Sequence, residues 1–77
     1  MLEEVIHVLE RIKPGIDYRK EKDLIMAHVL DSLNILMLTV ELEHEFLIVI
    51  PVPAVNADNF RNADAICRMV QALQYEE

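Results

Sequence analysis

One uninterrupted stretch, Leu33 to Phe46, constrains the fold of this chain more than any other segment. It contains neither glycine nor proline and is dense in apolar residues. At about 100° per residue, apolar positions recur along one side of it, which predicts an amphipathic helix with one face made for a core. The positions on that side are Ile35, Leu38, Leu42 and Phe46.

A second apolar stripe runs along the opposite side of the same expected helix. It consists of Leu33, Leu36, Met37 and Val40. A small domain does not easily bury both sides of one helix. We therefore expect this second stripe to meet solvent or a partner.

Asp31 and Ser32 stand where this helix is expected to begin. Either side chain has an oxygen that can cap the helix by accepting an orphan backbone N–H. A hydroxyl at this place also faces the positive end of the helix dipole, where the same N–H groups would stabilise a phosphate. The local sequence leaves both roles open for Ser32, a cap or a phosphate attachment point.

The N-terminal part of the chain predicts a first helix and then a long connection. Apolar residues at helical spacing define the helix, and Lys13-Pro14-Gly15 ends it, because Pro14 lacks an N–H and Gly15 permits a left-handed turn. The helix stripe is Leu2, Val5, Ile6, Leu9 and Ile12. The connection from residue 16 to 30 is expected to be pinned to the core by Ile16, Leu24, Ile25, Val29 and Leu30.

The C-terminal part predicts an extended segment and two more helical pieces. Residues 46–55 have β character, but two prolines and the lack of a pairing strand favour an extended segment that buries Phe46, Ile48 and Ile50. Asn56 is expected to cap a short helical turn through residue 60, and Asn62 a final helix. The core stripe of that helix is Ile66, Met69, Val70 and Leu73.

These elements make one all-α domain over residues 1–77, with three main helices, one short helix and a long loop between the first two. A chain of 77 residues with 53% hydrophobic residues can build one core, so wholesale disorder is not expected.

The net charge of −7 disfavours nucleic acid and anionic membranes as partners and favours basic partners. We expect no signal peptide, because Met1-Leu2-Glu3-Glu4 has no basic region ahead of an apolar run. We also expect no transmembrane helix, because no apolar run approaches about 18 residues. One cysteine excludes an internal disulfide framework and fits a reducing cytoplasm.

The tripeptide Asp31-Ser32-Leu33, opening an amphipathic helix in an acidic chain of this length, resembles an acyl carrier protein. The likeness extends to Phe46-x-Ile48-x-Ile50-Pro51 and to the segment 59–66, and it covers the chain from about Leu2 to Leu73. In that family the serine of the motif carries 4′-phosphopantetheine through a phosphodiester, and the terminal thiol holds an acyl group as a thioester. The resemblance implies a small four-helix carrier bundle that transports cargo and catalyses nothing itself.

The resemblance also assigns roles to residues and partners. It implies attachment of 4′-phosphopantetheine at Ser32, flanked by Asp31, which would position a metal ion or the transferase, and by Leu33. It implies two kinds of partner: a phosphopantetheinyl transferase, and acyl-loading and acyl-processing enzymes with basic and apolar docking patches. The partner-recognition residues would be Leu36, Met37, Val40 and Glu41. We expect a monomeric cytoplasmic protein of fatty acid or polyketide biosynthesis, with the acyl or aminoacyl cargo left open.

One departure from the family pattern lies just before the serine. Many members have a glycine where this chain has His28, and histidine adopts a positive φ there only at some cost.

The three histidines stand in different segments without a ligand partner, so we expect no metal site. Cys67 is expected to be half-buried. No G-x-S-x-G elbow is present to make Ser32 a catalytic nucleophile. The main alternative is an unmodified carrier-like helical interaction module, in which Ser32 is only a cap.

Overall fold

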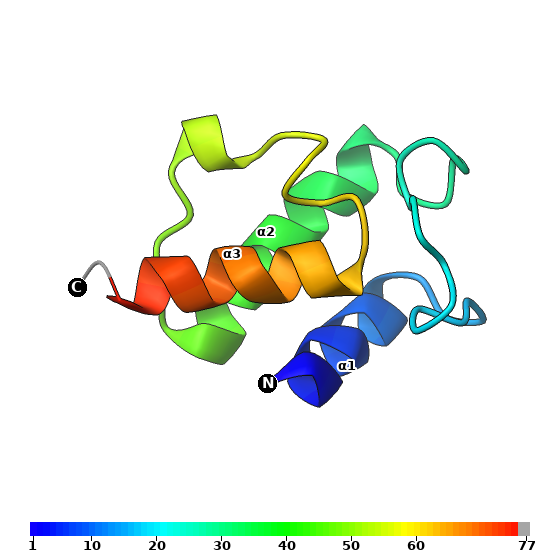
Figure 1. Ribbon diagram of the computed structural model, residues 1–77. Coiled ribbons are helices and arrows are strands. Elements are labelled where there is room, and N and C mark those ends of the chain that lie inside the picture. The colour runs from blue at the N-terminus through cyan, green and yellow to red at the C-terminus, as the bar shows by residue number, and fades with distance from the viewer. Residues whose placement is uncertain (76–77) are drawn as a thin grey trace.

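The computed structural model describes residues 1–75, and among these it holds three α-helices and no strand (Figure 1). The helices are α1 (Leu2–Ile12), α2 (Ser32–Phe46) and α3 (Ala63–Tyr75). A single 3-10 turn, η1 (Val52–Ala54), lies between α2 and α3. The predicted all-α class is confirmed, and α2 spans the residues that the sequence indicates. Within the described residues, no helix is long and apolar enough to cross a membrane.

Helix α1 contacts both other helices, and α3 crosses in front of α2 in Figure 1. The predicted core stripes point inward: Leu38 and Leu42 of α2 are fully buried, and Ile35 and Phe46 pack against the core from partly buried positions. In α1, Val8 is also fully buried, which the predicted stripe lacked. The buried residues of α3 are Ala63, Ala65, Ile66, Met69 and Val70.

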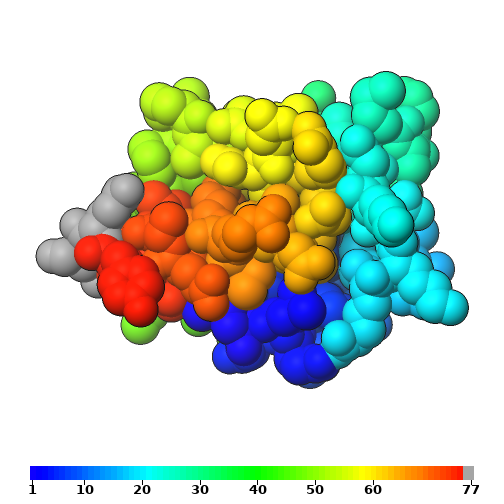
Figure 2. Space-filling model, in the orientation of Figure 1, coloured from blue at the N-terminus to red at the C-terminus, as the bar shows by residue number. Residues whose placement is uncertain are grey.

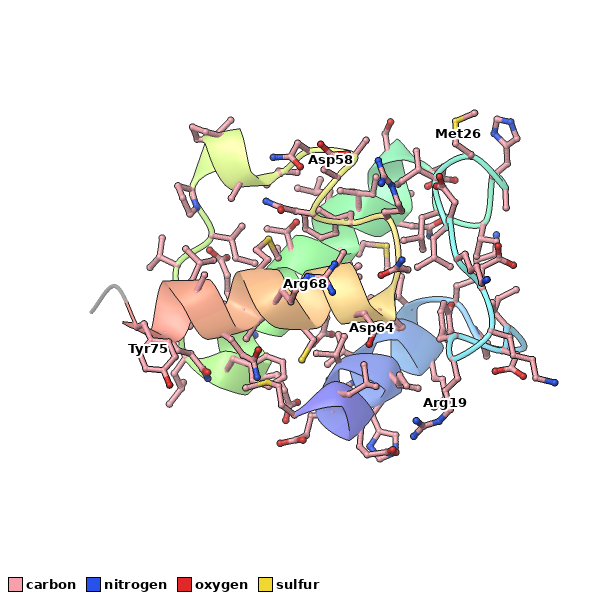
Figure 3. The ribbon with its side chains drawn as sticks, viewed as in Figure 1. Arg19, Met26, Asp58, Asp64, Arg68 and Tyr75 are labelled. Atoms are coloured by element: carbon pink, nitrogen blue, oxygen red, sulfur yellow. The ribbon has the colours of Figure 1, made fainter. Side chains whose placement is uncertain are left out.

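The long connection between α1 and α2 has no helix, yet it is anchored at several points. Gly15 adopts φ +90°, as the predicted left-handed turn requires. Leu24 and Leu30 are buried as predicted. Tyr18, which was not among the predicted anchors, is 3% exposed, and its hydroxyl donates a hydrogen bond to the carbonyl of Lys13 at the end of α1. Met26 marks the outer tip of this loop (Figure 3).

Two hydrogen bonds fasten this connection to the segment before α3. The backbone N–H of Leu24 donates to the carbonyl of Arg61 at 2.6 Å. The side-chain amide of Asn62 donates to the carbonyl of Lys22 at 3.1 Å. The same Asn62 accepts from the backbone N–H of Ala65 at 2.8 Å, which confirms it as the cap of α3.

The short fourth helix that the sequence predicts after Asn56 is only a single turn. Residues 57–60 form a turn, in which Asn56 accepts a hydrogen bond from the backbone N–H of Asn59 at 2.8 Å. This side-chain bond caps the turn as predicted, and the carbonyl of Asn56 accepts one helical bond from the N–H of Phe60 at 3.2 Å. The 3-10 turn η1 lies just before this turn. Pro51 and Pro53 confine η1, because proline lacks an N–H and is tolerated only in a first turn. The extended segment before it buries Ile48 and Ile50 as predicted.

Candidate functional site

The start of α2 shows which residue caps the helix. Asp31 is the N-cap, and its carboxylate accepts from the backbone N–H of Asn34 at 2.8 Å. The Asn34 side chain returns a bond by accepting from the N–H of Asp31 at 3.2 Å, which completes a reciprocal capping box. Ser32 is therefore the first residue of the helix, and its side chain is exposed and not used as the cap. Of the two capping candidates in the sequence, the structure selects Asp31.

The chain reaches Ser32 through a tight loop with His28 at its turning point. His28 has φ +56°, the left-handed conformation in which a glycine costs less. The carbonyl of Leu24 accepts from the N–H groups of Val29 and Leu30 at 3.0 and 3.1 Å. With Leu24 and Leu30 both buried, this loop holds the start of α2 at a fixed place on the surface.

A groove runs along α2 from Ser32. Its volume is about 530 Å³, and its walls are mostly apolar. Residues of α2 form one side and the extended segment with η1 forms the other. The lining residues are Ser32, Ile35, Leu36, Thr39, Val40, Glu43, Ile50, Val52 and Val55. Because Ser32 lies at one end of α2 and Glu43 in its last turns, the groove follows most of the helix.

Two polar side chains in the groove have partners that fix their positions. The Thr39 hydroxyl donates to the carbonyl of Ile35 at 2.8 Å, one turn back along the helix. Glu43 accepts from the backbone N–H of Ile50 at 2.9 Å through Oε2. This bond ties the extended segment to α2 and holds the far wall of the groove in place.

The second apolar stripe of α2 is exposed, as the sequence predicts. The exposed fractions are 62% for Leu33, 62% for Leu36, 43% for Met37 and 45% for Val40. Leu36, Met37 and Val40 also form a second, shallower hollow with Ile12 and Glu41. All four predicted partner-recognition residues, including Glu41, thus lie together on one surface.

Charges at the end of this surface are partly neutralised. Arg11 of α1 pairs with Glu45 at 3.2 Å and approaches Glu41 at 3.8 Å. Both pairs are solvent-exposed, so each contributes only up to about 1 kcal/mol. Glu43, between them in sequence, has no ion pair among residues 1–75.

The other residues weighed from the sequence lie apart from Ser32. His7, His28 and His44 are exposed on separate segments, and the described residues contain no group of three or more potential metal ligands. Cys67 is half-buried in α3, where burial is the main cause that raises the pKa of its thiol. A raised pKa keeps the thiol protonated and unreactive near neutral pH.

Sequence reasoning missed the residues that line the groove across from α2 and at its far end. Ile50 was predicted to be buried. The sequence did not predict that the exposed Val52 and Val55, or Glu43, line the same groove as Ser32. Ser32, Ile35, Thr39 and Glu43 follow helical spacing, which was a usable signal for one wall. The opposite wall has no periodicity that places it.

Comparison of the chain with family models, with curated proteins and with solved structures finds no match.

Proposed function

We propose that this protein is a carrier that holds an acyl or aminoacyl group on 4′-phosphopantetheine attached to Ser32, and that it is not itself an enzyme. One observation carries the proposal: Ser32 is exposed at the first position of α2 and stands free of the cap, which Asp31 provides. A serine that served as the cap would occupy the position of Asp31. The resemblance to acyl carrier proteins supplies the chemistry.

The first turn of α2 suits a phosphodiester on Ser32. Backbone N–H groups at a helix N-terminus and the positive end of its dipole stabilise an anion placed there. The transferase would form a bond between Ser32 Oγ and phosphorus while the diphosphate of coenzyme A breaks. The hydroxyl proton leaves, and adenosine 3′,5′-bisphosphate departs as the other product. The attached arm supplies a thiol that holds cargo as a thioester.

Asp31 and the surfaces beside Ser32 have separate roles in this proposal. The cap uses one oxygen of Asp31, Oδ1, so the second is left for a metal ion bound to the phosphates of coenzyme A. The exposed stripe from Leu33 to Val40, with Glu41, is where the transferase and the cargo-processing enzymes would dock. The net charge of −7 speeds the approach of partners with basic patches.

The test is the intact mass after incubation with coenzyme A, Mg²⁺ and a broad-specificity phosphopantetheinyl transferase. We expect a gain of one phosphopantetheine, absent in Ser32→Ala. Asp31→Asn is the sharper variant, because asparagine caps a helix as well as aspartate does but carries no charge. It should fold normally and be modified more slowly. A folded wild-type protein that gains no mass would overturn the proposal.

A rival function has its own structural observation. Leu47, Val49 and Val52 are 82%, 78% and 85% exposed, in a stretch without charged residues. An apolar surface of this kind suits an interaction module that binds a partner or a second copy. A dimer that survives dilution and the Ser32→Ala change, together with failure of modification, would favour this rival.

A further inference from the structure

The groove beside Ser32 ends at a carboxylate that has no ion-pair partner among residues 1–75. Arg11 binds the neighbouring acids Glu41 and Glu45, while Glu43 has no basic partner among the described residues. One oxygen of Glu43, Oε2, accepts from the N–H of Ile50. The second oxygen, Oε1, has no hydrogen bond among the described residues and belongs to a side chain that lines the groove. A groove with apolar walls thus has a negative charge at one place along its length.

The distance along α2 fits an arm attached to Ser32. Glu43 follows Ser32 by eleven positions in the same helix, which at about 1.5 Å per residue is roughly 16 Å along the axis. Phosphopantetheine has about as many backbone bonds between phosphorus and sulfur as four to five amino acid residues. At about 3.5 Å per extended residue, it spans roughly 15 to 17 Å. An arm lying in the groove therefore brings its thioester next to Glu43.

The charge at that point distinguishes classes of cargo. An α-aminoacyl thioester carries an ammonium group on the carbon next to the thioester carbonyl, so this cation would lie beside Glu43. A simple fatty acyl group has no cation there and would leave the carboxylate facing an uncharged chain. The Glu43 side chain is already fixed by one hydrogen bond, so it loses little conformational freedom when its carboxylate pairs with an ammonium group.

We propose that Glu43 makes this carrier selective for aminoacyl cargo, by pairing with the ammonium group of an arm that lies in the groove along α2. This inference rests on the proposed attachment at Ser32. Arg11 contributes indirectly, because it occupies Glu41 and Glu45 and leaves Glu43 as the acid available to the cargo. Ile50 holds the Glu43 side chain in position through its backbone N–H.

The experiment compares two arms that differ in one group. The transferase would load the protein with amide-linked coenzyme A analogues that carry either alanyl or lactyl, which exchanges an ammonium group for a hydroxyl. The readout is the ¹⁵N–¹H spectrum, in which the Ile50 amide reports on Glu43. An exposed ion pair predicts that alanyl occupies the groove about two- to five-fold more than lactyl, with a correspondingly larger shift of the Ile50 signal.

Matched variants separate Glu43 from its neighbours. Glu43→Gln retains an oxygen for the Ile50 N–H and should abolish the difference between the two arms. Glu45→Gln, whose carboxylate binds Arg11 outside the groove, should preserve the difference. On the wild-type protein, 1 M salt should reduce the difference between the two arms, because the Debye length at that concentration is about 3 Å. This measurement does not depend on how a variant folds.

The outcomes distinguish the two proposals. Intact mass first shows whether wild type and variants receive an arm at all, and failure there would overturn the carrier function and this inference with it. On a loaded protein, equal Ile50 shifts from alanyl and lactyl would overturn the inference alone. A difference that persists in Glu43→Gln would also overturn it, because another group would then be the source.

Discussion

Helices α1 and α2 pack against each other but differ on the sides turned away from the core. The outer side of α1 is polar, with Glu3, Glu4, His7 and Glu10 exposed. The outer side of α2 begins with Leu33, Leu36, Met37 and Val40, all exposed. Burial in the core accounts for all the apolar positions that recur along α1, but for only one of the two apolar stripes of α2. The other stripe of α2, which adjoins Ser32, is where the proposed partners would dock.

The largest expected effect comes from a substitution on the inner, buried side of α2. Leu42 is fully buried, so Leu42→Ala should lower the free energy of unfolding by about 2 to 5 kcal/mol. Urea unfolding followed by circular dichroism measures this. A loss below about 1 kcal/mol would show that α2 does not depend on its inner side for stability.

The second prediction concerns the C-terminal end of α1, where Tyr18 closes the helix from the following loop. Tyr18→Phe removes the hydroxyl that binds the Lys13 carbonyl and should cost about 1 kcal/mol at neutral pH. Burial, and to a lesser extent the charge of Glu10, raises the pKa of Tyr18 above the usual tyrosine value. The folded state therefore holds this proton more tightly than the unfolded state.

The sign of the pH dependence follows from that shift. The contribution is fully present below the unfolded pKa of about 10 and is lost as pH rises through the higher folded pKa. Wild-type stability should therefore fall more steeply than that of Tyr18→Phe above about pH 10. Parallel curves for the two proteins in alkaline urea titrations would contradict the prediction.

The third prediction concerns the loop that leads from α1 to α2. His28→Gly should raise the free energy of unfolding by about 0.5 to 1 kcal/mol, because glycine adopts the φ of +56° at less cost. His7→Gly, at an exposed position inside α1, is the control of opposite sign, with an expected loss of about 0.3 to 0.5 kcal/mol. Thermal melts of both variants measure the pair. Destabilisation by His28→Gly would show that the imidazole makes a contribution of its own.

The smallest effect on stability is expected on the outer side of α2. Leu36→Gln should change the free energy of unfolding by no more than about 0.5 kcal/mol, since Leu36 is 62% exposed and both residues favour helices. If this side is a docking surface, the same change should slow transferase modification about five-fold or more. Unchanged modification kinetics would remove Leu36 from the recognition surface.

The sequence anticipated those features that depend on local spacing. Leu38 and Leu42 face inward because they share a helical side, and Asn62 caps α3 because its oxygen reaches the N–H of Ala65. The burial of Tyr18 was not predictable in this way, because it depends on carbonyls at the end of another element.

The candidate site divides along the same line. Ser32 and the outer stripe of α2 follow from the pattern of one helix, whereas the groove requires Ile50 and Val52 to return alongside it. Their path is set by prolines, a left-handed residue at Leu47 and the Glu43 bond. None of these has a periodic signature. After Asn56, by contrast, the cap and the single turn follow from the local sequence, as predicted.

The bonds from Leu24 to Arg61 and from Asn62 to Lys22 have a consequence for synthesis of the protein. The loop that places Ser32 is held by residues that are translated much later, with Asn62 forty positions after Lys22. While the chain is still being made, α1 and α2 can form, but their connection lacks the contacts that fix it. We therefore expect the loop, and with it the presentation of Ser32, to become ordered only after the ribosome has released the start of α3. An enzyme that recognises Ser32 in this setting would act on chains from which the start of α3 has emerged and ignore shorter ones.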